Sequence, residues 1–174
     1  MSVHEKFFIS DTHFFHENIL KFTGDDGKRI RPFNSMEEMH EYMVAKWNSV
    51  VHDNDNVYHL GDVTFRYGKE FNELMSRLKG RKRLILGNHD RVKGTDLLKW
   101  FEKLDLWKGF KEHNFTASHI PLMLNSLRDG AFNVHGHTHQ NCLEDAHYIN
   151  VSVEVRDYTP VHIDVIGNEI LCHR

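Results

Sequence analysis

The stretch "RKRLILGNHD", Arg81 to Asp90, joins a run of apolar residues to a cluster of polar ones. The apolar part predicts a short buried β-strand, and Gly87 begins the loop that follows it. Three other apolar runs end in the same way, at Asp11-Thr12-His13, at Gly61-Asp62 and at Gly136-His137-Thr138-His139. In an open α/β sheet the carboxyl ends of the strands share one edge, where ligands bind. We therefore expect the polar residues of these four segments to meet in space.

Strands and helices alternate in the first half of the chain. Lys6 to Ser10 and the stretch "NVYHLGD" predict two strands. Ser35 and Glu38 form a capping-box pattern, and the following apolar residues up to Val50 recur at helical spacing. Two further helices are predicted, over Lys69 to Leu78 with a stop at Gly80, and over Thr95 to Leu104.

The second half is predicted to be mostly strand. "LWKGFKEHNFTASHI" is typical of a hairpin, and "GAFNVHGHTH" and "HYINVSVEV" predict further strands. The final stretch, "PVHIDVIGNEILCH", is expected to form a hairpin that turns near Gly167-Asn168. Neither a linker nor a repeat divides the sequence, so residues 1–174 are expected to form one domain of the α/β class, with its site at the carboxyl ends of strands.

Composition excludes several classes of protein. The net charge of −3 does not favour long nucleic acid as a partner. The start, "MSVHEKFFIS", does not resemble a signal peptide, and apolar runs are too short for a membrane span, so a cytoplasmic location is expected. Cys142 and Cys172 are expected to be free, buried thiols. The 15 histidines are the unusual feature, and three of them alternate in "FNVHGHTHQN", which suggests a shared metal.

The combination of these motifs closely resembles the calcineurin-like metallophosphoesterase superfamily. The family pattern runs D-x-H, GD, GNH[D/E], H and GHxH. The chain supplies "DTH" at 11–13, "GD" at 61–62, "GNHD" at 87–90, His119 and "GHTH" at 136–139. The similarity is greatest to the compact prokaryotic and phage-type phosphoesterases. It implies a β-sandwich of two sheets flanked by helices, with the site at the ends of the strands.

The resemblance also implies the ligands of two divalent ions. One ion would be bound by Asp11, His13 and His139, and the other by Asn88, His119 and His137, with Asp62 as the bridge. Carboxylate, amide and imidazole ligands suit Mn²⁺ first, with Fe, Zn, Mg or Ni as alternatives. Two such ions hold a phosphoryl group and make water a nucleophile at neutral pH. His135, His16 and His59 are expected to support the site or the core rather than to bind metal.

In the family the histidine of the GNH motif is a catalytic acid, a role that falls here to His89. Asp90 either holds the tautomer of His89 and raises its pKa, or is a helix cap or solvated turn residue. Arg31, Arg66 and Arg91 are candidates for substrate binding, and each has the alternative of a solvated surface charge. Arg31 is the first candidate because it lies in the pliable basic loop "GDDGKRIRPF", which alternatively is a plain connection.

The sequence therefore predicts a binuclear metal-dependent phosphoesterase. A phosphodiesterase that acts on a nucleotide or another small phosphoester is favoured. The alternatives are a catalytically inactive scaffold of the same fold, which the presence of His89 and every ligand disfavours, and a protein phosphatase. The physiological substrate and the oligomeric state stay open, and a homodimer is among the allowed states.

Overall fold

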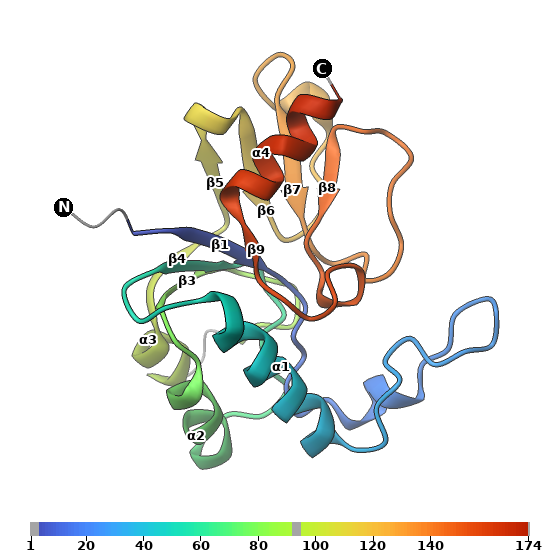
Figure 1. The fold of residues 1–174 in the computed structure, drawn as a ribbon, viewed down its shortest axis with the longest axis vertical. Helices are drawn as coiled ribbons and strands as arrows, with labels where there is room; N and C mark the ends of the chain where they lie inside the picture. The colour runs from blue at the N-terminus through green and yellow to red at the C-terminus, as the bar shows by residue number, and fades with distance from the viewer. Residues whose placement is uncertain (1–3, 92–94, 174) are drawn as a thin grey trace.

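The computed structural model describes residues 4–91 and 95–173, which form two mixed β-sheets flanked by helices (Figure 1). The first sheet has the order β4-β3-β2-β1-β9, in which four strands are parallel and β9 is antiparallel to β1. Its strands are β1 (Lys6–Ile9), β2 (Asn56–His59), β3 (Arg81–Ile85), β4 (Phe101–Asp105) and β9 (Val161–His162). This architecture confirms the predicted α/β class with two sheets.

The second sheet has the order β5-β6-β7-β8, with one antiparallel pair at β5 and parallel pairs between the others. Its strands are β5 (Trp107–Phe110), β6 (Phe115–Ser118), β7 (Phe132–His135) and β8 (Tyr148–Asn150). The antiparallel β5–β6 pair confirms the hairpin predicted from the sequence. The parallel pairs align the carboxyl ends of β6, β7 and β8 at one edge.

The helices of the described residues are α1 (Met36–Val50), α2 (Lys69–Arg77), α3 (Thr95–Trp100) and α4 (Ile163–Cys172). Short 3₁₀ helices occur at η1 (Glu17–Lys21), η2 (Lys111–His113), η3 (Leu124–Ser126) and η4 (Val153–Val155). The Ser35 hydroxyl caps α1 by accepting the Glu38 N–H at 3.0 Å. The Glu38 carboxylate accepts the N–H of Asn34 at 2.7 Å. Both halves of the predicted cap are therefore present, with the second displaced by one residue.

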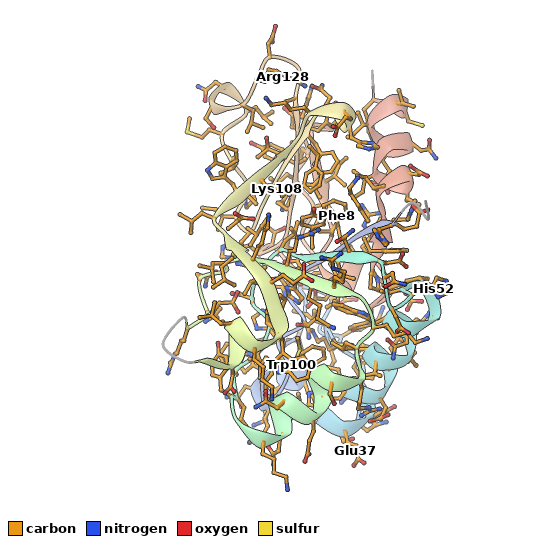
Figure 2. All side chains as sticks on the ribbon, turned by 90° about the vertical axis from the view of Figure 1, so that its left-hand side faces the viewer. Phe8, Glu37, His52, Trp100, Lys108 and Arg128 are labelled. Carbon is orange, nitrogen blue, oxygen red and sulfur yellow. The ribbon has the colours of Figure 1, made fainter. Side chains whose placement is uncertain are left out.

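Two apolar clusters hold the layers together. One lies between the first sheet and the helices, where Met43 and Trp47 of α1 meet Val57 and Leu84 of the strands. The other joins Phe8, on the opposite face of the first sheet, to the second sheet and to α4. Figure 2 shows Phe8 near the middle of the molecule, between the helical layer marked by Glu37 and the second sheet. Because successive strand residues face opposite sides, Phe7 and Phe8 serve different clusters.

Three sequence predictions were wrong. The predicted third helix ends at Trp100, and Phe101–Asp105 instead pairs with β3 as the outer parallel strand. The predicted C-terminal hairpin is a helix, because Ile163, Ile166 and Ile170 recur at helical spacing and are buried together. Cys142 and Cys172 are free, as expected, but exposed rather than buried.

The predicted "HYINVSVEV" strand is also shorter than expected. β8 ends at Asn150, and the chain then enters η4. Near this point Ser10 bonds the chain after β8, donating its N–H to the carbonyl of Val151 and accepting the N–H of Val153, each at 3.1 Å. The bonds join the end of β1 to the end of β8 and bring the edges of the two sheets together. The helices among the described residues include none that is both long and apolar enough to cross a bilayer.

Candidate metal centre

Two groups of metal-ligating side chains lie where the carboxyl ends of the two sheets meet. Within each group the ligand atoms lie within 4.8 Å of one another. The first group, which we call position one, is Asp11, His13 and His139, and the second, position two, is Asp62, His119 and His137. The residues come from the loops after β1, β2, β6 and β7, as predicted from the strand ends.

Asp62 joins the two positions. Its Oδ2 lies 3.6 Å from Nε2 of His13 and 3.5 Å from Nε2 of His119, so one oxygen faces both groups. Its other oxygen, Oδ1, accepts the backbone N–H of His89 at 2.9 Å. That bond fixes the carboxylate plane and leaves Oδ2 directed between the two positions.

Position one contains buried polar atoms without partners. Asp11 is completely buried, and its Oδ2 accepts the hydroxyl of Ser152 at 2.9 Å and the N–H of His137 at 2.8 Å. Its Oδ1 and both ring nitrogens of His13 form no hydrogen bond among the described residues. Buried polar atoms are costly when they are unpaired, so a carboxylate oxygen and an imidazole directed at one point fit a bound cation.

Burial lowers the pKa of His13, which favours the neutral imidazole that a metal requires. Burial also opposes ionisation of Asp11, but the His13 contact and the nearby His119 and His139 outweigh it and hold the pKa of Asp11 below its usual value. A neutral imidazole beside an ionised carboxylate is the protonation state suited to metal binding.

Position two is more open. Nδ1 of His119 lies 2.7 Å from the carbonyl oxygen of Leu60, which leaves its Nε2 for the centre. That Nε2 lies 2.9 Å from Oδ1 of Asn88, so the predicted amide ligand also reaches position two. His137 is exposed, with its ring centre 5.0 Å from that of His119.

The backbone at the ligands is unusual. Nine described residues other than glycine have a positive φ, and five of them are predicted ligands: Asp11, His13, Asp62, His137 and His139. Such conformations are disfavoured for residues with a side chain and cluster at functional sites. The loops are tightly packed as well, because a Cβ atom at Gly136 would collide with Ser10 and with the Asp11 carboxylate. Glycine at this position therefore allows the loop after β7 to approach Asp11.

Comparison with known proteins agrees with this geometry. Residues 7–169 match the family model described as calcineurin-like phosphoesterase. The chain belongs to the calcineurin-like phosphoesterase family. This family is metal-dependent, and the match confirms the resemblance drawn from the motifs.

Two proteins and one solved structure illustrate what this chain is similar to. The uncharacterized protein MJ1445 of Methanocaldococcus jannaschii is 37% identical over 177 residues, which cover 95% of the chain and 91% of that protein. The Gene 66 protein of Mycobacterium phage L5 is 39% identical over 87 residues, or 48% of the chain and 38% of that protein. The crystal structure of a protein of unknown function, AQ665 of Aquifex aeolicus, superposes with a TM-score of 0.75 at 27% identity, covering 95% of the chain and 99% of that protein.

Glu154, in η4, is a residue beside the candidate metal centre that the sequence analysis missed. Its Oε1 accepts a hydrogen bond from Nδ1 of His139 at 2.8 Å, which leaves Nε2 of His139 for a metal. Burial raises the pKa of Glu154, but Arg31 and His139 outweigh this effect and hold it below its usual value. Burial lowers the pKa of His139, whereas Glu154 raises it above its usual value. A lone acidic residue in the apolar run "VSVEV" was the signal that could have found it.

The prediction that Arg31 binds substrate was wrong. Its side chain is fully buried, and its guanidinium donates to Glu154 Oε1 at 2.6 Å and to the carbonyls of Asp11 and Thr12 at 2.5 and 2.8 Å. The residue lies behind the ligands and balances the charge of Glu154. The loop "GDDGKRIRPF" itself projects from the body of the chain (Figure 1).

His89 is exposed at the rim of the metal centre. The centre of its ring lies 5.8 Å from the centre of the His13 ring. The prediction that Asp90 holds the tautomer of His89 was wrong. Its carboxylate accepts the backbone N–H groups of Asp62, Val63 and Gly87, each at 2.9 Å. Burial raises the pKa of Asp90 against the effect of these bonds. Asp90 thus fixes the loop that carries Asp62, a structural role close to the turn alternative.

Three further histidines that were predicted not to bind metal lie near the ligands or in the core. His59 is buried with its Nε2 2.9 Å from the Thr12 hydroxyl, and His135 is completely buried. His16 stacks on Phe65 with 4.0 Å between ring centres. The two remaining arginine candidates, Arg66 and Arg91, are exposed, and Arg66 pairs with Glu70 and Glu17. Their contact with substrate, like metal binding by the seven ligands, stays a prediction.

Proposed function

We propose that the protein is a binuclear metal-dependent phosphoesterase that hydrolyses small phosphate esters. The observation that carries this proposal is the position of Asp62 Oδ2, which faces His13 on one side and His119 on the other. A single carboxylate oxygen shared by two ligand groups is the arrangement that a pair of divalent ions needs.

Asp11, His13 and His139 would hold one ion, and Asn88, His119 and His137 the other, with Asp62 shared. When bound, the two ions supply Lewis acidity for the phosphoryl group and acidify water. The described part of the chain offers no thiolate to either group, and the oxygen and nitrogen donors suit Mn²⁺ best, with Fe, Zn, Mg or Ni as alternatives.

The chain itself supplies orientation and a proton. His89 is held at the rim through its backbone bond to Asp62, and its exposed ring is free to meet the ester. We assign it the role of general acid that protonates the departing oxygen. Asp90 positions the same loop through its three backbone bonds, so the acid and the shared ligand keep a fixed spacing.

A phosphodiester of a nucleotide or of another small molecule is the favoured substrate class. The alternatives are an inactive scaffold of the same fold and a protein phosphatase. The compact chain, in which α1–α3 cover one sheet and α4 lies beside the other, offers little additional surface for a folded protein substrate (Figure 1). An inactive scaffold would have no need for the five strained ligand residues.

The test is to strip the protein of metal and titrate it with Mn²⁺ while both bound metal and hydrolysis of bis-p-nitrophenyl phosphate are measured. We expect two ions per chain and hydrolysis that appears with the second ion. Stoichiometric binding without hydrolysis of either a diester or a monoester would support the scaffold. Hydrolysis of phosphopeptides in preference to small esters would support the protein phosphatase.

A further inference from the structure

A pocket of about 380 Å³ opens beside the candidate metal centre. Its walls include Ile19, Phe22, His137, His139, Gln140 and Asn141. Two of the predicted metal ligands, His137 and His139, therefore belong to the pocket as well as to the centre. A molecule whose phosphate lay on the centre could extend directly into this pocket.

One wall is apolar and is built around Phe22. Ile19, in η1, belongs to the same lining and is buried, and the N–H of Ile30 donates to the carbonyl of Phe22 at 2.9 Å. The His16 ring meets the Phe22 ring edge-on, with 5.8 Å between ring centres and 78° between planes. These contacts support the Phe22 ring, yet 48% of its surface is exposed. An aromatic ring that packs against the protein on one side and is exposed on the other is suited to stack on another flat ring.

The rest of the lining is polar, and the turn that forms it is held by hydrogen bonds. The buried side chain of Asn150 donates from Nδ2 to the Thr138 hydroxyl at 3.1 Å and to the carbonyls of His139 and Asn141 at 2.8 and 3.2 Å. These bonds fix the turn that carries Gln140 and Asn141. Among the described residues, the side-chain amides of these two make no hydrogen bond, so both are available to a ligand.

The charged residues in the lining of the pocket limit which chemical groups it can bind. Its described lining includes no lysine and no arginine, and its one carboxylate, Glu154, is buried against Arg31. Apart from the two histidines that belong to the metal centre, a second phosphate group would find no counter-charge in the described lining. An uncharged flat group with hydrogen-bonding atoms at its edge fits the apolar wall and the two amides together.

We propose that this pocket binds the nucleobase of a nucleoside phosphoester, with Phe22 stacking on the base and Gln140 and Asn141 bonding its edge. The proposal rests on the proposed phosphoesterase function and narrows its substrate to nucleotide esters. Base recognition would raise the affinity for the ester without altering the chemistry at the metal centre.

The kinetic test compares two diesters that differ only in the base. One is the dinucleotide thymidylyl-thymidine, and the other is the same diester of two abasic deoxyriboses, with the products of both measured by mass spectrometry. We expect kcat/KM to be at least about tenfold higher for the dinucleotide, because stacking on an aromatic side chain has an effect of this size.

Phe22→Ala should abolish this preference, mainly through KM, and leave the abasic diester unaffected. Phe22→Tyr should retain the preference because it keeps an aromatic ring. Trp107→Ala removes an exposed aromatic side chain on the second sheet and should change neither substrate. Equal rates for the two diesters, or an equal loss on both in Phe22→Ala, would overturn the proposal while leaving the phosphoesterase function intact.

A binding measurement decides the proposal even if neither diester is hydrolysed. Calorimetry in the presence of Mn²⁺ would compare thymidine 5′-monophosphate with deoxyribose 5-phosphate. We expect the nucleotide to bind at least about tenfold more tightly, and Phe22→Ala to remove the difference. Equal affinities would overturn base binding. Absence of hydrolysis together with a retained difference would count against the phosphoesterase function alone.

Discussion

The two metal positions differ in how the chain supports them. At position one, Asp11 and His13 are almost completely buried, and His139 is held by Glu154, which in turn is held by the buried Arg31. At position two, His137 and Asn88 are exposed, and Nδ1 of the buried His119 is held by a backbone carbonyl rather than by a buried carboxylate. A ligand set that is fixed before binding loses less entropy when it binds. We therefore expect position one to bind its ion more tightly and position two to exchange its ion more readily.

Asp62→Asn should have the largest effect, because it removes the one charge that both positions share. We expect bound metal to fall from two ions per chain toward none and activity to fall to the background rate. Metal analysis and ester hydrolysis, measured on the same sample, check this prediction.

The matched control for that variant is Asp157→Asn. Asp157 also has a positive φ, but its carboxylate is exposed and pairs with Lys46 on the surface. It should keep two ions and full activity. If Asp62→Asn kept two ions and most of its activity, the carboxylate would not bridge, and the two positions would have to be treated as independent.

His89→Asn should leave both ions bound and slow hydrolysis of an alkyl phosphoester by roughly 10²–10⁴-fold. The loss should be much smaller for a nitrophenyl ester, because its leaving group departs without a proton. Rates on the two esters and the metal content test this expectation, with His147→Asn, at a partly exposed residue that pairs with Asp145, as the control. An equal loss on both esters would assign His89 to ground-state binding instead.

Glu154→Gln should separate the two positions. It removes the charge that orients His139, so the tighter of the two dissociation constants should weaken by about 10- to 100-fold while the weaker one is unchanged. A two-site calorimetric titration measures both values. Glu169→Gln, which removes a carboxylate that pairs with Arg156 away from the ligands, is the control. If the weaker constant moved instead, our order of the two positions would be reversed.

Arg66→Ala should have the smallest effect. The Arg66 side chain is exposed and forms ion pairs with Glu70 and Glu17, so its contribution to substrate binding should be small. We expect its loss to raise KM by about two- to fivefold at most. Arg77→Ala, which breaks a similar exposed pair with Glu41, is the control and should leave KM unchanged. Identical KM values for the two variants would make Arg66 a surface charge without a role at either position.

The convergence of the seven candidate ligands could be predicted because each follows a strand, and strand ends converge in this class of fold. Glu154 could not be assigned in the same way. It lies in an apolar run outside every motif, and its role depends on η4 passing behind His139. Arg31 was assigned to the substrate because it lies in a basic loop, whereas the fold turns its side chain inward. The direction of a loop side chain depends on which charge the rest of the chain buries beside it.

The sequence by itself determined the order of the strands and helices in the first half, the types of candidate ligand and their attachment to strand ends. These features are local, since they follow from apolar runs, glycines and the residues that come next. Only the tertiary structure decided that Phe101–Asp105 is a strand, that one oxygen of Asp62 faces both positions and that Arg31 supports Glu154. Each of these depends on residues distant in sequence, because a strand needs a partner and a buried charge needs an opposite one.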